Sequence, residues 1–229
     1  MSMRRYVTVV NISAELWDPD GMARTTYHHG ALRAALIDAG LALANDGGPD
    51  QVVLREVART AGVSHSAAYR HFADRDALLT EVARRARAEL AAEMRGRIAR
   101  ATDPRARLQA TGTAYIGFAL SRPGLFRTAF GALPATEPDP DAAPADDPHR
   151  ILGQVLDEAQ AAGLLDPRVR PGAEIAAWSA VHGLASLLLD GSLSATPADI
   201  DFAVAQVLGL VNRGLLDDGT PEPATAQRG

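Results

Sequence analysis

Polar and aromatic side chains gather within the stretch Leu54–Leu79, at positions where a packed helix would carry apolar residues. Hydrogen-bond donors follow one another closely there: they are His65, Ser66, Tyr69, Arg70, His71 and Arg75. Donors of these types suit the phosphate oxygens and the base edges of a nucleic acid. The stretch is therefore a candidate nucleic-acid-reading surface, and the major groove of DNA is the partner that we favour.

Two short helices separated by a glycine must hold these donors in place. Helical spacing of apolar residues predicts a first helix whose buried stripe is Leu54, Val57, Ala58 and Ala61. Gly62 stops that helix, because glycine accepts a left-handed backbone without a side-chain clash. Ser64 is a suitable N-cap for a second helix over residues 65–72. This is a helix-turn-helix pattern, with the second helix in the recognition position.

From Tyr27 to Leu79 the sequence resembles the N-terminal DNA-binding domain of the TetR family of bacterial transcriptional regulators. The most specific part is AGVSHSAAYRHFADRDALL, in which a Tyr-x-His-Phe run precedes a polar turn and two leucines. Two positions depart from the family pattern. Val53 or Leu54 stands where many members have a Ser or Thr cap, and Arg75 replaces a lysine that contacts phosphate.

The leading hypothesis assigns a role in DNA binding to each candidate residue. We predict that phosphates are held by Arg55, Tyr69, His71 and Arg75. We predict that base edges are met by His65, Ser66, Ala67 and Arg70, and Ser64 completes the set as the cap. Small residues such as Ala67 keep the helix surface low enough for close approach.

The rest of the chain predicts helices only, since no segment shows sustained alternation of apolar and polar residues. We expect an all-α fold with helices at about 30–45, 75–100, 104–121, 123–130, 148–162, 172–189 and 197–213. The expected division is a flexible extension over 1–24, a three-helix DNA-binding domain over 25–74, a helical ligand-binding and dimerisation domain over 75–214 and a flexible tail over 215–229. Residues 132–147, rich in Pro, Ala and Asp, are predicted to be a disordered linker.

Two later stretches, Ala114–Gly131 and Ala176–Leu193, resemble the regulatory domain named for its Trp-His-Gly residues, here Trp178, His182 and Gly183. The resemblance implies a pocket for a small ligand. Candidate ligand-binding residues are Met94, Tyr115, Phe118, Phe126, Phe130, Trp178 and His182. For each of them a plain role in the core is the alternative. For His182 we favour packing, with a ring nitrogen bonded to a backbone carbonyl, over contact with a ligand.

The resemblance also implies a homodimer formed through the last two long helices. The final one is apolar around most of its circumference, with Phe202, Ala205, Val207, Leu208 and Val211, so it must be buried on several sides. The alternative is that both helices lie at the centre of a monomer core. We favour the dimer, because paired half-sites in DNA also require one.

Composition restricts the remaining classes of protein. The chain has 229 residues, no cysteine and a net charge of -5, and all 23 basic residues are arginine. It contains no apolar run of the length that crosses a bilayer and no secretory signal pattern, which predicts a cytoplasmic protein without a membrane partner. No residues have metal-ligand spacing, and we predict neither a metal nor a cofactor. The acidic balance does not exclude DNA binding, because local charge at the phosphates decides it.

Together these features predict a ligand-responsive transcriptional regulator, most readily a repressor that binds a palindromic operator as a homodimer and is released by a small molecule. An enzyme is disfavoured, because the sequence has no glycine-rich phosphate loop and no nucleophile–base pair. The competing hypothesis is a helix-turn-helix architectural or protein-interaction module without ligand control.

Overall fold

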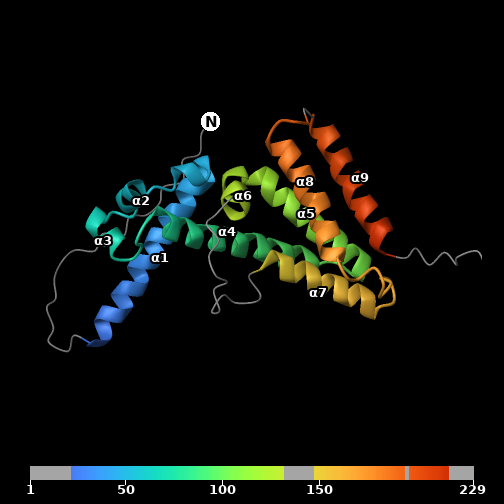
Figure 1. The fold of residues 1–229 in the computed structure, drawn as a ribbon, viewed down its shortest axis with the longest axis horizontal. Helices are drawn as coiled ribbons and strands as arrows, with labels where there is room; N and C mark the ends of the chain where they lie inside the picture. The colour runs from blue at the N-terminus through green and yellow to red at the C-terminus, as the bar shows by residue number, and fades with distance from the viewer. Residues whose placement is uncertain (1–21, 132–146, 194–195, 217–229) are drawn as a thin grey trace, which may run out of the picture.

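The computed structural model describes residues 22–131, 147–193 and 196–216, and every regular element within these ranges is a helix (Figure 1). The predicted all-α fold is confirmed. The elements are α1 (Met22–Gly47), the short 3-10 helix η1 (Pro49–Gln51), α2 (Leu54–Thr60), α3 (His65–Tyr69), α4 (Arg75–Ile98), α5 (Pro104–Ser121), α6 (Pro123–Phe130), α7 (Pro148–Ala161), α8 (Ala173–Leu189) and α9 (Pro197–Leu215).

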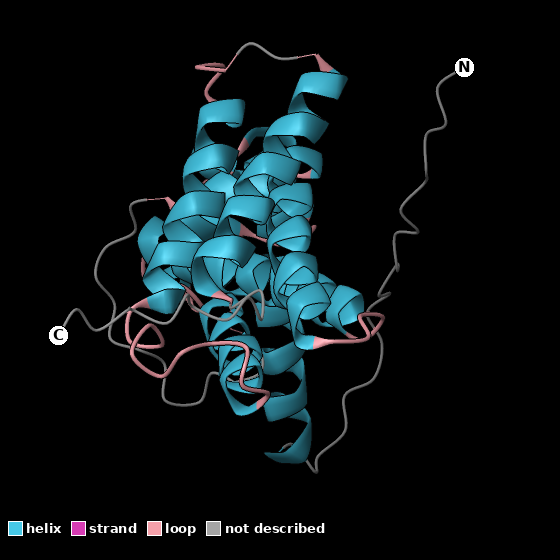
Figure 2. Ribbon diagram, turned by 90° about the vertical axis from the view of Figure 1, so that its right-hand side faces the viewer, coloured by secondary structure: helices cyan, strands magenta, loops and turns pink. Residues whose placement is uncertain are grey.

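The long helix α4 joins the two ends of the molecule (Figure 1). At one end it packs against α1, beside α2 and α3, and toward the other it packs against α5, α6 and α7. Helices α8 and α9 lie side by side at the far end, where α5 contacts both of them. Figure 2 views the molecule from this end, with α8 and α9 toward the reader.

The core follows the apolar stripes of the sequence. On α4 the predicted inner face of Leu78, Leu79, Val82, Ala86, Leu90 and Met94 is buried throughout. One cluster of buried side chains continues from α2 and α3 along α4 into α5, α6 and α8. The end that holds α2 and α3 and the far end therefore share a continuous packed interior.

Side-chain caps and prolines set many of the helix boundaries. The predicted Ser64 cap accepts a hydrogen bond from the backbone N–H of Ala67, and Asp74 accepts one from that of Ala77. Thr196 and Asp199 form a reciprocal capping box at the start of α9, where Pro197 takes the first turn. Where the sequence lacks such a cap, at Val53, helix α2 starts without a side-chain bond.

The structure corrects several predicted boundaries. Helix α1 begins at Met22, inside the predicted flexible extension, because a glycine such as Gly30 weakens a helix by only ~1 kcal/mol and need not start one. Helix η1 was not predicted. Leu215 ends α9 and Leu216 is buried, so both belong to the folded part of the chain. The predictions for residues 1–21, 132–146 and 217–229 lie outside the described residues.

In the described part of the chain, no helix has both the length and the apolar character needed to cross a membrane. Nor do the described residues bring together three histidine or carboxylate side chains that could hold a metal ion.

Candidate functional sites

The helix α3 is a short, capped element held by buried side chains on one side. Gly62 turns the chain with a φ of 70°, and the partly buried side chain of Val63 packs the turn against the core. Ala68 and Phe72 are buried and anchor the helix from below. The structure ends α3 at Tyr69, earlier than the predicted Phe72, because Arg70 and His71 close a tight turn through bonds to carbonyls three residues back.

The opposite side of α3 faces away from the protein. His65, Ser66, Tyr69 and Arg70 are exposed, and Tyr69 keeps 48% of its surface accessible. The His65 and Tyr69 rings meet edge to face with centroids 4.7 Å apart. Ala67 is half-buried and adds little bulk. The exposed side of α3 therefore presents hydrogen-bond donors with little added bulk, which suits entry into a DNA groove.

Three further predicted DNA-contacting residues lie on α2 or at the two ends of α3. Ser64 is exposed at the start of α3, where its hydroxyl caps the helix. Arg55 is exposed on α2, and His71 is half-buried after the end of α3. Their contacts with DNA stay predictions.

Arg75 has a contact within the protein that the sequence did not indicate. Its Nε donates to the Val52 carbonyl at 2.9 Å and its Nη2 to the Pro49 carbonyl at 2.7 Å. The side chain is 39% exposed, with Asp50 3.9 Å from Nη2. Arg75 thus fastens the start of α4 to η1 and to the strand-like link before α2, whether or not it also contacts phosphate.

Replacing Arg75 with lysine separates these two roles. Lysine keeps the charge but cannot reach both carbonyls with a planar fork, so we expect stability without DNA to fall by about 1–2 kcal/mol, or roughly 3–6 °C in Tm. Thermal unfolding measures this, with Arg55→Lys on the exposed face of α2 as the matched control. If the Tm of Arg75→Lys is unchanged, the two hydrogen bonds do not contribute to stability, and the predicted phosphate contact is the remaining role of Arg75.

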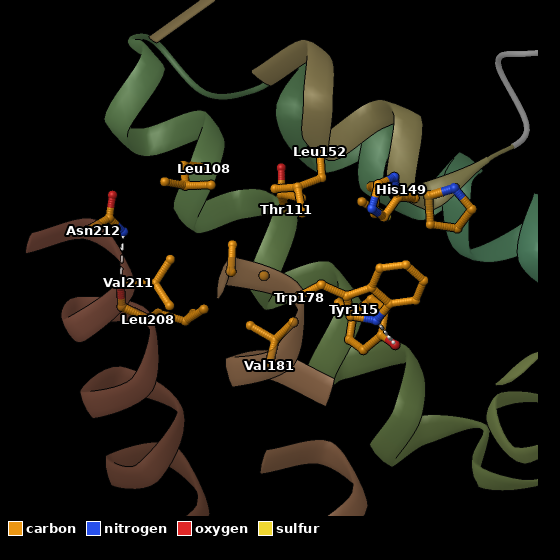
Figure 3. A pocket seen from close by; sticks show the side chains of 14 residues that line it. Leu108, Thr111, Tyr115, His149, Leu152, Trp178, Val181, Leu208, Val211 and Asn212 are labelled. Atoms are coloured by element: carbon orange, nitrogen blue, oxygen red, sulfur yellow. Dashed lines mark hydrogen bonds between the residues drawn. The ribbon is translucent and has the colours of Figure 1, made fainter. Parts of the chain in front are cut away.

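The second site is an apolar pocket between α4, α5, α7, α8 and α9 (Figure 3). Its cavity volume is ≈ 30 Å³, room for about two water molecules, so its walls are nearly in contact. It is lined by Met94, Leu108, Thr111, Gly112, Tyr115, Pro148, His149, Leu152, Ala177, Trp178, Val181, Leu208, Val211 and Asn212.

The structure brings only three of the predicted ligand residues into this pocket: Met94, Tyr115 and Trp178. Phe126, Phe130 and His182 lie beyond Tyr115 and border a separate, more open hollow of ≈ 170 Å³. Phe118 lines neither space, because it is fully buried under the Arg122 guanidinium, whose carbon lies 4.3 Å from the ring centre. Arg122 is held there by Glu89, at 2.7 Å, and by Glu93.

A hydrogen-bonded trio separates the two spaces. The indole Nε1 of Trp178 donates to the Tyr115 hydroxyl at 3.0 Å, and that hydroxyl lies 2.8 Å from Nδ1 of His182 (Figure 3 shows the first bond). Burial raises the pKa of Tyr115 above its usual range and lowers the pKa of His182. A neutral imidazole can accept a hydrogen bond from the Tyr115 hydroxyl at Nδ1. The favoured partner for His182, a backbone carbonyl, is thus wrong for Nδ1, which bonds a side chain.

Helix α6 connects this trio to the end of the molecule that holds α1, α2 and α3. Its Phe126 and Phe130 rings lie 5.5 Å from the Tyr115 ring, centre to centre. At its first turn Gly124 packs against the last turn of α1, so closely that a Cβ there would lie 2.2 Å from the Ala44 carbonyl oxygen. A short rigid helix therefore spans the distance between the pocket wall and α1.

Comparison with protein-family models identifies both halves of the chain. Residues 36–82 match the model described as bacterial regulatory proteins, tetR family, and residues 108–211 match that of the tetracyclin repressor-like C-terminal domain. The two matches together span more than half of the chain. No curated protein matches it. The Trp-His-Gly subtype of the C-terminal domain stays a prediction.

Solved structures show the same fold. A protein of unknown function from Rhodococcus sp. RHA1 is 32% identical, with a TM-score of 0.66, over 83% of this chain and 98% of that one. A TetR family transcription regulator from Marinobacter aquaeolei VT8 is 21% identical, with a TM-score of 0.60, over 85% and 99% of the two chains. A TetR variant from Acinetobacter baumannii AYE, in complex with minocycline, is 22% identical, with a TM-score of 0.57, over 78% and 93%.

The structure and the two family models indicate the same family. The structure has a capped, outward-facing α3 and a helical domain behind it, as the two models require. The chain belongs to the TetR family and is a DNA-binding transcriptional regulator, not an enzyme.

Proposed function

We propose that this regulator is a repressor that binds a palindromic operator as a homodimer and leaves it when a small molecule enters the pocket. The observation that carries the proposal is the pairing of two sites in one chain: an exposed donor face on α3 and an apolar pocket among the later helices α4, α5, α7, α8 and α9. The function belongs in the cytoplasm, where bacterial DNA is found.

Reading of DNA would rest on α3. Its four exposed residues supply an imidazole, a hydroxyl, a phenol and a guanidinium within about two turns. Arg70 is the best suited to a guanine, since a guanidinium can bond O6 and N7 together. Tyr69 and Arg55 would contact phosphates and so fix the register.

The dimer would form on α8 and α9. Apolar side chains are exposed along both helices, with Ile175 at 70%, Phe202 at 66% and Leu210 at 64%. Large apolar groups that line up on an outer face usually mark a protein interface. A second copy of this chain fits best, because a two-fold dimer presents two α3 helices to a two-fold operator.

Release would follow from a difference in ligand affinity between two conformations. A molecule larger than the cavity must push its walls apart, and the wall at Tyr115 touches α6 through Phe126 and Phe130. Because α6 packs against α1, displacement there would shift α1 and, through α2, the helix α3. The minocycline complex of the Acinetobacter protein supports a small-molecule effector for this fold.

Footprinting of the promoter beside its own gene tests the proposal. We expect a protected palindrome, and Arg70→Ala should weaken binding there about 10-fold or more, with relaxed specificity at one base pair. Arg150→Ala is the control, because Arg150 is an exposed arginine on α7, remote from α3. Equal binding of all DNA sequences, or no response to any small molecule, would favour the architectural module instead.

A further inference from the structure

The walls of the apolar pocket select against charge. Among the fourteen described residues that line it, none is an arginine, an aspartate or a glutamate, and most are aliphatic or aromatic. His149 is the one lining side chain that can carry a positive charge, and its ring already packs against that of Trp178, with centroids 4.9 Å apart. Beside the aliphatic and aromatic walls, an ion would lose its hydration with little in return. A ligand of this pocket is therefore uncharged and largely apolar.

Most polar atoms in the lining are already bonded within the protein. The Thr111 hydroxyl donates to the Arg107 carbonyl at 2.9 Å, and Trp178 donates to Tyr115. Tyr115 in turn is bonded to His182. These bonds stabilise the walls and use up the donors of Thr111 and Trp178, although the Thr111 hydroxyl keeps an acceptor lone pair.

Asn212 on α9 is different. It is 7% exposed, and its Nδ2 donates to the Leu208 carbonyl at 3.1 Å. That bond fixes the orientation of the amide, because only the nitrogen can donate to a carbonyl. The other end, Oδ1, is buried without a hydrogen-bond partner and points away from the α9 backbone at the end of the pocket (Figure 3).

We infer that the pocket takes an uncharged, mainly apolar molecule with one hydroxyl or N–H group, which donates its hydrogen bond to Oδ1 of Asn212. This rests on the proposed function, in which the pocket is the effector site. A buried acceptor without a partner carries a desolvation cost, and a ligand that supplies a donor removes that cost. A ligand of the same shape without the donor leaves the cost in place.

Because the cavity is small, a side chain in its wall must move before a ligand can bind. At ≈ 30 Å³ it is much smaller than a ring-sized molecule needs, so binding must displace a wall. Met94 is the lining side chain best able to give way, because it is unbranched and has three rotatable bonds. Shortening Met94 to alanine should therefore favour apolar ligands of every kind equally.

Phenol, toluene and benzoate test the inference as a matched set of a donor, its isosteric hydrocarbon and an anion. The chain has two tryptophans, Trp17 and Trp178, so Trp17→Phe in the full-length protein leaves Trp178 as the only indole to report binding. We expect phenol to change Trp178 emission with an affinity about 10-fold above that of toluene. Benzoate should have no effect at the same concentrations.

Asn212→Leu then removes the acceptor and keeps the number of side-chain heavy atoms. Phenol should lose its advantage over toluene there, because its hydroxyl would be buried without a partner. Gln154→Leu, at an exposed amide on α7, should keep the preference for phenol. Equal affinities in the unsubstituted pocket would overturn the inference, as would a preference that survives Asn212→Leu. The phenol–toluene comparison needs no substitution in the pocket, so a poorly folded variant does not remove the test. If neither molecule binds, the pair is repeated in Met94→Ala, where absence of binding also overturns it.

Operator binding measured with the same compounds separates this inference from the proposed function. Phenol that binds with the Asn212-dependent preference but leaves operator affinity unchanged supports the hydrogen bond and counts against the pocket as effector site. Release by benzoate, with no effect of phenol, supports ligand control and contradicts the neutral donor.

Discussion

Changing both Phe202 and Leu210 to glutamate is expected to make the protein monomeric and to weaken operator binding by about 100-fold or more. The two side chains lie two turns apart on α9 and are 66% and 64% exposed. In a dimer they would be buried, and four acids placed in one interface would each lose hydration without a partner.

The expected loss of DNA affinity comes from the loss of the second recognition helix in the particle, since α3 itself is unchanged. With two reading heads in one particle, binding of the first half-site makes binding of the second intramolecular, which raises affinity by roughly 10² to 10⁴. A monomer keeps its recognition helix and loses this factor. It should therefore still bind a single half-site weakly, with the same base preference.

Sedimentation or light scattering measures the oligomeric state, and titration of the operator measures affinity. Leu120→Glu is the matched control, because Leu120 is also a partly exposed apolar residue, at 36%, but lies on α5. Both variants should keep the helical content of the wild type, since surface changes alter stability by only about 0.5 kcal/mol. A Phe202/Leu210 double variant that stays dimeric would place the interface elsewhere.

Sequence alone was enough where local chemistry decides the structure. Helix α5 begins at Pro104 and α6 at Pro123, both as predicted, because proline fits the first turn and cannot continue a helix. The turn at Gly62 and the cap at Ser64 also follow from short-range rules. These rules need only a few neighbouring residues, all visible in the sequence.

The pocket could be predicted only in part, because distant segments form it. Aromatic residues indicated a cavity, yet Phe118 proved to be buried core. Leu108, His149 and Asn212 come from three helices and were not predicted to line it. An asparagine directly after the apolar residues Leu210 and Val211 was the available signal for Asn212. Its unpaired oxygen depends on how α5, α7 and α9 converge, which no local pattern contains.

The bond between Arg75 and η1 was missed for a similar reason. Its acceptors are the backbone carbonyls of Pro49 and Val52, and any residue type supplies a carbonyl. Resemblance to the family directed attention to charge at this position, whereas the structure adds a role in which the fork shape of arginine matters.

Gly124→Ala is expected to have the largest effect of any single methyl group on both stability and regulation. The added Cβ would lie 2.2 Å from the Ala44 oxygen and 2.8 Å from the Asn45 oxygen, both backbone atoms of α1 that cannot rotate away. Helix α6 must then move off α1. Overpacking of this kind costs about 1–3 kcal/mol, or roughly 3–10 °C in Tm.

Gly96→Ala is the control, because nothing lies within 4 Å of a Cβ at that position of α4. There alanine should raise stability by up to ~1 kcal/mol, since it favours the helix over the unfolded chain. We therefore expect the same change of residue to lower the Tm at Gly124 and to raise it at Gly96, which thermal unfolding measures.

The effect on DNA tests α6 as the link between the pocket and α3. When α6 is pushed away from α1, the last turn of α1 and η1 lose their support, and Arg75 is bonded to η1. Operator affinity of Gly124→Ala should therefore fall below that of Gly96→Ala at a temperature where both are folded. A Gly124→Ala protein with reduced stability but unchanged operator affinity would mean that α1 moves independently of α3, and the proposed path for release would have to run through α4 instead.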